Sequence, residues 1–155
     1  MDTVDKQTRS RIMANIKGKN TKPEITVRSL LHRRGFRFRL HDKALPGKPD
    51  LVLRKYKAVI FVHGCYWHRH ENCKLASTPK QNKEFWRKKF AANLRRDGEV
   101  YYKLKLLGWR TAVIWECAIR DKKNLADYIK TLACWLKSEC EYLEIPENSY
   151  ELNEF

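Results

Sequence analysis

The chain has 155 residues, of which 33 are lysine or arginine and 18 are aspartate or glutamate, giving a formal charge of +15 at pH 7. We expect a single domain over residues 1–155, because this length suffices for one substantial core. The basic balance favours a polyanionic partner, nucleic acid first and a membrane surface second. The sequence has no apolar run that could span a bilayer and no lipidation motif, so we expect no membrane partner.

The two ends of the chain differ in character. Residues 1–6 contain no apolar signal core, which predicts a cytoplasmic protein whose five cysteines are reduced and available to metal. Residues 138–155 contain six glutamates and no lysine or arginine. This acidic tail shows no clear hydrophobic period, so we expect it to be loosely held.

A short basic helix is predicted over residues 7–17, within an N-terminal arm of residues 1–20. Its apolar side holds Ile12, Met13 and Ile16. Such a helix can dock on the core, or it can lay Met13 and Ile16 against the minor groove of DNA. The residue pattern alone favours docking on the core.

The run Thr21-Lys22-Pro23-Glu24 has the pattern of a capping box and predicts a helix from this point to Arg34, ended by Gly35. Alternating apolar residues predict a half-buried strand over 36–40. A turn over 45–50 then leads into a hairpin of strands 51–53 and 58–62. The hairpin brings Asp50 close to the end of its second strand, although an aspartate in a turn is common without any function.

The second half of the chain reads as helix, strand and helix. A strongly basic helix is predicted over 81–107, with a possible interruption at Gly98 and its end at Gly108. A strand follows over 109–115. Asp121 is the expected cap of a last helix, whose buried stripe contains Leu125, Ile129, Leu132 and Leu136.

Residues 59–73 (V-I-F-V-H-G-C-Y-W-H-R-H-E-N-C) carry the densest chemistry of the chain. Cys65, His70 and Cys73 are spaced as three metal ligands, and Cys117, at the end of the last predicted strand, is the best fourth. Three thiolates and one imidazole form a closed tetrahedral site, which predicts structural Zn²⁺. Cys134 and Cys140 are expected to be packing or surface residues.

His63 and His68 remain beside this predicted zinc loop, close to the strand end that approaches Asp50. A carboxylate and a backbone carbonyl can hold Mg²⁺ on a phosphate, and a histidine can exchange a proton near neutral pH. The three residues together favour phosphodiester hydrolysis, although either histidine alone could be an ordinary surface residue.

Several motifs resemble those of the bacterial very-short-patch repair (Vsr) endonucleases, in matching order over about residues 5–120. They are T-R-S-x-x-M at 8–13, L-P-G-K-P-D at 45–50, V-I-F-V-H-G-C-Y-W-H at 59–68, E-F-W at 84–86, R-D at 96–97 and G-W-R with W-E-C-A at 108–118. The resemblance implies an α/β restriction-endonuclease-like fold, with a mixed central sheet flanked by helices and a structural zinc.

The activity implied by the resemblance is Mg²⁺-dependent nicking of double-stranded DNA, 5′ to the thymine of a T·G mismatch that arises when 5-methylcytosine deaminates. It implies a monomer that acts on the bacterial nucleoid, in a pathway shared with mismatch-repair proteins and a cytosine-5 methyltransferase.

The resemblance also implies residue roles. Asp50 and the backbone carbonyl of Val62 would bind Mg²⁺, with Glu24 near the metal. His63 and His68 would be catalytic, His68 being the general acid or base, and Asp97 would be an acidic neighbour. The zinc ligands would be Cys65, His70, Cys73 and Cys117. DNA would be contacted by Met13, Ile16, Tyr66, Trp67, Trp86, Lys89 and Asn93, which favours a DNA-contacting N-terminal helix over one docked on the core.

The chain departs from the family pattern at three places. Val62 stands where Thr can occur, Tyr66 replaces the more usual Phe, and one extra residue separates His70 from Cys73. The acidic-x-Lys element common in this nuclease fold is also absent, so the histidines are expected to do its work. Two rival functions remain: a zinc-stapled DNA-binding module without catalysis, and a nuclease that cuts both strands of unmodified sites.

Overall fold

A computed structural model describes residues 20–147 of the chain. Its first half contains helix α2 (Lys22–Arg33), strands β1 (Arg39–Leu40), β2 (Leu51–Leu53) and β3 (Ala58–His63), and the 3₁₀ turn η1 (Arg54–Tyr56). Its second half contains α3 (Lys83–Leu106), β4 (Arg110–Trp115), α4 (Glu116–Arg120), α5 (Leu125–Leu136) and β5 (Tyr142–Ile145). The predicted helix 7–17, with Met13 and Ile16, lies outside the described residues.

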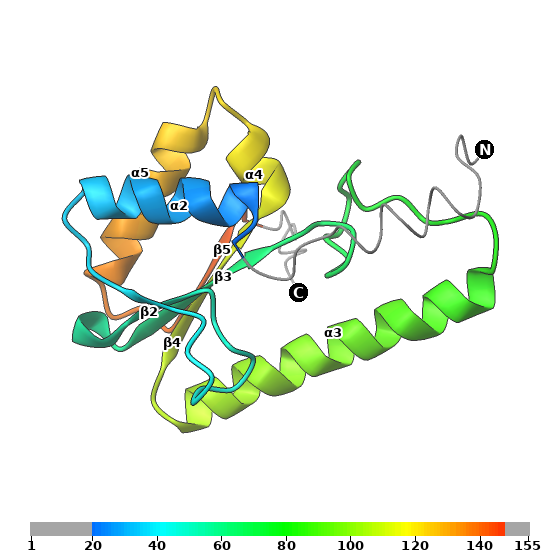
Figure 1. Cartoon of the computed structure of the whole chain (residues 1–155), viewed down its shortest axis with the longest axis horizontal. Coiled ribbons are helices and arrows are strands. Elements are labelled where there is room, and N and C mark those ends of the chain that lie inside the picture. Colours follow the sequence, from blue (N-terminus) through cyan, green and yellow to red (C-terminus); the bar gives the residue numbers. More distant parts are fainter. Residues whose placement is uncertain (1–19, 148–155) are drawn as a thin grey trace, which may run out of the picture.

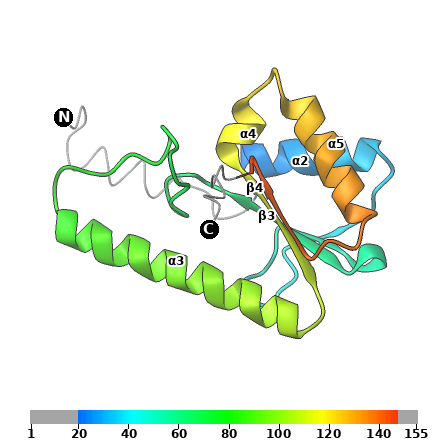
Figure 2. The same ribbon diagram turned by 180° about the vertical axis from the view of Figure 1, so that it is seen from behind.

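The described strands form one mixed sheet in the order β1-β2-β3-β4-β5. The strands β1, β2 and β3 are antiparallel, whereas β3, β4 and β5 are parallel. Helices α2, α4 and α5 cover one face and the long α3 crosses the other, so the architecture is α/β in three layers (Figure 1). Seen from behind, β5 lies at the sheet edge beside β4, close to α5 (Figure 2).

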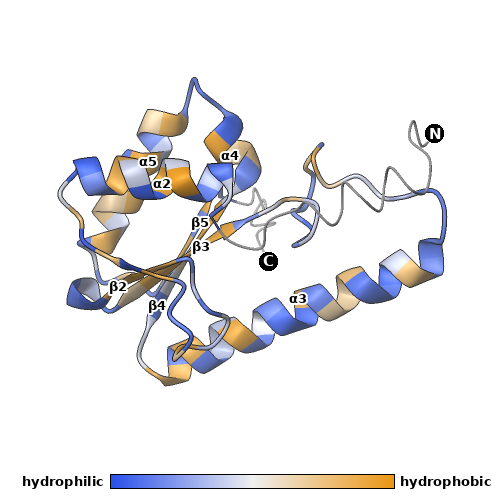
Figure 3. Cartoon of the chain, in the orientation of Figure 1, coloured by the Kyte–Doolittle hydropathy of each residue, from blue (hydrophilic) through white to orange (hydrophobic). Residues whose placement is uncertain are grey.

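Two apolar cores follow from the alternation of side chains along the strands. Leu51, Leu53 and Ile60 face α2, α4 and α5, whereas Val52, Val59 and Phe61 face α3. Figure 3 shows the same division, with apolar strands inside and a mostly hydrophilic α3 outside. Because β3 and β4 are buried on both sides, each contains a continuous apolar run, residues 58–62 in β3 and residues 112–115 in β4.

The start and end of α2 confirm the predicted signals. The Thr21 side chain accepts a hydrogen bond from the N–H of Glu24 at 3.4 Å, and Gly35 follows the helix at φ +90°. The hairpin is also confirmed, because Leu51 pairs with Ile60 and Leu53 with Ala58. No helix in the described range 20–147 is long and apolar enough to cross a membrane.

Several boundaries differ from the predictions. The strand expected over 36–40 is confined to Arg39–Leu40, and Phe36 turns into the core instead. Gly98 does not interrupt α3, because one glycine costs only about 1 kcal/mol in a helix. Asp121 is not the helix cap: α5 begins after Asn124, whose N–H the Asp121 carboxylate accepts at 3.3 Å.

The acidic segment is also more ordered than expected over its first part. Tyr142–Ile145 forms β5, parallel to β4, and Ile145 is buried. Leu143 and Ile145 pack on the core shared with α5, whereas Glu144 lies on the opposite face of the strand and accepts the indole N–H of Trp115 at 2.7 Å. The alternation of apolar and polar residues in β5 is short, and the surrounding glutamates obscured it in the sequence.

Candidate active site and metal centre

Three groups of ligand-type side chains gather within the described residues. They are Cys65, His70, Cys73 and Cys117; His63, His68 and Asp97; and Glu24, His41 and Asp50. All three lie near the carboxyl ends of β3 and β4, where His63 pairs with Trp115. The loop after β3 supplies members of two groups, while Glu24 lies in α2, Asp97 in α3 and Asp50 directly before β2. Parallel strand ends are where open α/β sheets place their functional groups.

The cysteine and histidine group matches the predicted zinc ligands. One donor atom from each residue lies within 4.8 Å of the others. The Nδ1 atom of His70 is 3.4 Å from the Cys117 sulfur and 3.7 Å from the Cys65 sulfur. Donors around a tetrahedral zinc ion are separated by roughly 3.5–4 Å, so these four residues fit the ion with small adjustments.

Burial and packing set the protonation states and the position of this group. Burial raises the pKa of the Cys65 thiol, so without a metal the deeply placed sulfurs stay protonated. Burial also lowers the pKa of His70, which leaves the neutral imidazole that a metal requires. The His70 ring stacks on Trp115 at 4.3 Å between centroids, and Glu144 of β5 holds that indole by its N–H.

The histidine group joins both predicted catalytic histidines. The rings of His63 and His68 are stacked, 3.7 Å apart and 6° from parallel. His68 Nδ1 lies 2.7 Å from the Asp97 carboxylate. The Tyr101 hydroxyl lies 3.4 Å from His63 Nδ1. Burial first, and then the neighbouring His68, lower the pKa of His63, so His63 is neutral at physiological pH.

A cavity of about 420 Å³ opens in front of this pair. Its walls come from the turn at Gly47, the end of β3, the loop after β3 and α3. Gly47 has φ +73°, and a Cβ there would meet the Val100 side chain of α3. The turn can therefore approach the helix only through a glycine, and this approach forms one wall of the cavity.

The third group consists of Glu24, His41 and Asp50, and Asp50 lies at the end of β3 as the predicted hairpin requires. The backbone N–H of Val62 donates to Asp50 Oδ2 at 2.7 Å. Glu24 is 2% exposed, and His41 Nε2 lies 2.5 Å from its Oε1 and 3.9 Å from Asp50 Oδ1. Burial raises the pKa of Asp50 to about 6, against the lowering effect of the Val62 N–H, and the charge of Glu24 raises it further.

The predicted DNA-contacting aromatics lie together on the loop after β3 and on α3. The centroids of Trp67 and Trp86 are 6.1 Å apart, and both rings contact Tyr66 edge-on. The Lys89 ammonium lies 5.4 Å from the Trp67 centroid, and Asn93 donates to the Trp67 carbonyl at 3.2 Å. The loop aromatics and these helix residues thus form one surface next to the cavity in front of His63 and His68.

His41 and Tyr101 are functional candidates that the sequence prediction missed. Tyr101 had a signal, because Lys89, Asn93, Asp97 and Tyr101 follow each other at intervals of four along α3 and line the same cavity. His41 had none, since its position depends on a left-handed backbone (φ +47°) between β1 and the turn.

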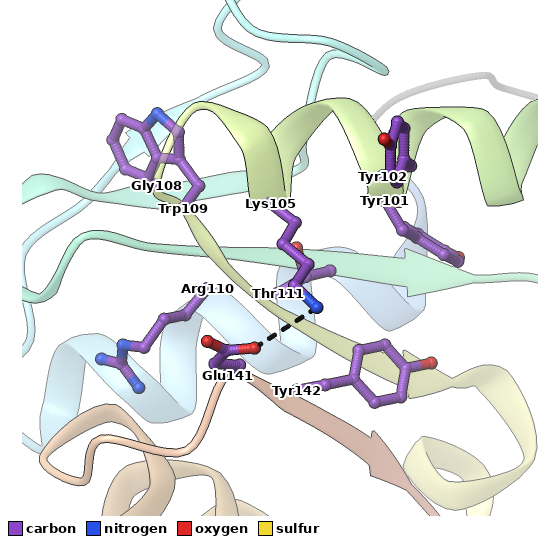
Figure 4. Close-up of a pocket in the computed structure, with 9 residues that line it drawn as sticks. All are labelled: Tyr101, Tyr102, Lys105, Gly108, Trp109, Arg110, Thr111, Glu141 and Tyr142. Carbon is purple, nitrogen blue, oxygen red and sulfur yellow. Dashed lines mark ion pairs between the residues drawn. The ribbon is translucent and has the colours of Figure 1, made fainter.

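A second cavity of about 290 Å³ lies where α3 ends and β4 and β5 begin (Figure 4). Figure 4 shows Lys105 reaching across to Glu141, with a nitrogen to oxygen distance of 3.7 Å. Tyr101 lines both cavities, and its ring lies 6.3 Å from that of Tyr142. The three ligand groups lie at the opposite ends of these strands, so this cavity is separate from them.

Comparison with known proteins gives consistent results. Residues 1–75 match the model of the family described as DNA mismatch endonuclease Vsr. The chain is 42% identical to the DNA mismatch endonuclease Vsr of Escherichia coli over 140 residues, covering 89% of each protein. It is 45% identical to the type II nicking enzyme V.XorIIP of Xanthomonas oryzae, over 77% of this chain and 88% of that protein. It is 43% identical to the type II nicking enzyme V.NmeAIP of Neisseria meningitidis, over 88% of this chain and 96% of that protein.

Proposed function

The chain belongs to the Vsr family of DNA mismatch endonucleases and is a DNA-nicking hydrolase, and from this premise we propose that it nicks one strand 5′ to the thymine of a T·G mismatch with Mg²⁺ held at Asp50. The observation that carries the proposal is that the Asp50 carboxylate accepts the Val62 N–H at the end of β3, beside the stacked His63 and His68 rings. A metal carboxylate next to a proton-transfer group is the arrangement that phosphodiester hydrolysis needs.

The donors around Asp50 fit a divalent cation. Asp50 Oδ2 is held by a backbone N–H, and its Oδ1 faces Glu24 and His41. We assign Asp50 and the backbone carbonyl of Val62 as Mg²⁺ ligands, with Glu24 beside them. When bound, the ion polarises the phosphate and stabilises the charge that develops on it.

His68 is the residue we assign to proton transfer. Asp97 engages its Nδ1, which fixes the ring and leaves Nε2 to exchange a proton with water or the leaving oxygen. The neutral His63 ring stacks on the His68 ring and supports it, and the Tyr101 hydroxyl can form a hydrogen bond with His63 Nδ1. Val62 offers only its backbone, so these histidines complete a site that lacks the usual acidic-x-Lys element.

Mismatch recognition is assigned to the aromatic surface. Tyr66, Trp67 and Trp86 would enter the base stack beside the mismatch, and each base–aromatic contact is worth about 1–3 kcal/mol. A T·G wobble pair is more easily deformed than a matched pair, so this insertion favours the mismatch. Lys89 and Asn93 would face the mismatched pair, while Met13 and Ile16 of the N-terminal arm would contact the minor groove.

Cys65, His70, Cys73 and Cys117 are proposed to hold a structural Zn²⁺, because three thiolates and one imidazole form a closed tetrahedral set. The mixed α/β sheet supports a restriction-endonuclease-like fold, which we propose for the single domain 1–155. We further propose a monomer that acts on the nucleoid in the bacterial cytoplasm, where a cytosine-5 methyltransferase creates the sites and mismatch-repair proteins share the pathway.

A strand-cleavage assay tests the proposed activity. End-labelled duplexes with one T·G pair, or T·A at the same place, are incubated with Mg²⁺ and wild type, Asp50→Asn or the exposed control Asp127→Asn. We expect a single nick 5′ to the mismatched thymine, lost in Asp50→Asn and retained in Asp127→Asn. Mismatch binding without cleavage would identify a binding module, and cleavage of both strands of the T·A duplex would identify a restriction-type nuclease.

A further inference from the structure

We propose that His41 is a direct ligand of the divalent cation held by Glu24 and Asp50, and that its imidazole gives this site a preference for Mn²⁺ over Mg²⁺. The inference rests on the proposed function, since it concerns the metal site of that activity. It adds a nitrogen donor to a site otherwise described by carboxylates and a backbone carbonyl.

The hydrogen bonds of the two carboxylates direct one oxygen of each toward His41. Asp50 Oδ2 accepts the Val62 N–H, and Glu24 Oε2 accepts the Asn20 N–H at 2.9 Å. The other oxygens, Asp50 Oδ1 and Glu24 Oε1, are the ones nearest His41 Nε2. One atom from each of three residues therefore points to a common centre, with each carboxylate anchored on its far side.

The separations suit one small cation. The three donor atoms lie within 4.8 Å of one another. Around an ion with bonds of about 2.1 Å, adjacent donors are about 3 Å apart and opposite donors about 4.2 Å apart. The 2.5 Å distance from His41 to Glu24 and the 3.9 Å distance from His41 to Asp50 lie on either side of the value for adjacent donors, so small side-chain rotations would complete the set.

The backbone holds His41 in this place. Its φ is +47°, in the left-handed region, which a residue with a Cβ enters at a cost of about 1–2 kcal/mol. Its N–H donates to the Asp50 carbonyl at 3.3 Å, which ties the two ligand residues together across the turn. Strained backbone of this kind is retained where the surrounding structure needs the side chain in one direction.

The alternative role for His41 is that of a cation. A protonated His41, like Arg28 at 3.6 Å from Glu24 Oε1, would neutralise the carboxylates and compete with a metal. The two roles predict opposite results on removing the imidazole. If His41 is a ligand, removing its imidazole weakens the binding of transition metals. If His41 is a competing cation, removing it strengthens the binding of every cation.

The choice of probe follows from donor chemistry. Imidazole is a good ligand for first-row transition metals, whereas Mg²⁺ prefers oxygen. Mn²⁺ accepts the same carboxylates as Mg²⁺, is paramagnetic, and stands low enough in the affinity order to leave zinc at the thiolates. Mn²⁺ bound to the zinc-loaded protein therefore reports on the Asp50 site.

The test combines Mn²⁺ titration with pulsed electron paramagnetic resonance on the full chain. We compare wild type, His41→Gln, Asp50→Asn and His68→Asn, checking each by thermal unfolding. We expect ¹⁴N modulation from a coordinated imidazole in wild type and His68→Asn, and none in His41→Gln. His41→Gln should also weaken Mn²⁺ binding by about tenfold or more, with a much smaller change for Mg²⁺.

The controls separate this inference from the proposed function. Mn²⁺ binding that requires Asp50 but shows no nitrogen coupling would overturn the role of His41 and leave the metal-dependent activity standing. Stronger binding of both cations by His41→Gln would identify His41 as a competing cation and overturn the inference. If wild type has no Mn²⁺ site that depends on Asp50, the proposed assignment of Asp50 as a metal ligand is wrong, and the inference about His41 is overturned as well.

Discussion

Replacing Asp50 by asparagine should stabilise the protein when the metal site carries no added cation. Burial raises the pKa of Asp50 from 3.8 to about 6, so the folded state favours the neutral acid. The stability that this group contributes is full below about pH 4 and is lost as the pH rises through 6. A difference of about two units corresponds to roughly 3 kcal/mol of unfolding free energy at pH 8. Asparagine keeps an oxygen for the Val62 N–H and carries no charge.

Urea unfolding measures this effect, using zinc-loaded protein dialysed without chelator. Asp50→Asn should have a larger free energy of unfolding than wild type at pH 8, and the difference should be smaller at pH 5. Asp127→Asn, on the exposed side of α5, should change the free energy of unfolding by under about 0.5 kcal/mol. Adding Mg²⁺ should raise the stability of wild type and of Asp127→Asn but not that of Asp50→Asn. A variant that is less stable than wild type at pH 8, or a difference that does not change with pH, would refute the reasoning.

Two further predictions concern activity. Trp67→Ala should weaken binding to a T·G duplex by about 1–3 kcal/mol in a competition assay, with less loss on a matched duplex, because it removes one stacking ring. Tyr102→Ala, an exposed ring at the other end of α3, is the control, and equal losses on both duplexes would count against the wedge. Asp97→Asn should slow single-turnover nicking by about 10²-fold or more while mismatch binding is retained, since the neutral amide no longer fixes the His68 tautomer that presents Nε2 for proton transfer. Unchanged cleavage would show that His68 does not need this partner.

The predicted zinc ligands and the hairpin came from the sequence because their signals are local. The spacing of Cys65, His70 and Cys73 is that of a metal loop, and the apolar run into Gly64 marks a strand end. Cys117 could be predicted as the fourth ligand from the single assumption that the ends of two neighbouring strands meet, and the end of β4 does lie beside the end of β3. The contact of Asp50 with Val62 followed from a two-strand hairpin alone.

The parts that escaped prediction depend on long-range packing. His41 meets Glu24 only because a left-handed residue turns the chain between β1 and the 45–50 turn, and no pattern in the sequence signals that conformation. The length of β1 and the existence of β5 depend on what the sheet edges pack against. Asp97 was expected near the active site from the resemblance, but its contact with His68, 29 positions away, follows only from the way α3 crosses the sheet.

The loop after β3 explains why one short stretch serves three purposes. Within it, Cys65 and His70 belong to the proposed zinc site, Trp67 to the proposed DNA surface and His68 to the proposed catalytic pair. Short-range turns shape its backbone, such as the His68 N–H to the Gly64 carbonyl at 3.2 Å and the His70 N–H to the Cys65 carbonyl at 3.0 Å. Because ligands stand on both sides of Trp67 and His68, a metal clamp at Cys65 and His70 fixes the two functional side chains between them. The proposed zinc therefore positions the chemistry as well as stabilising the fold, in the way that outer supports of a site govern its precision.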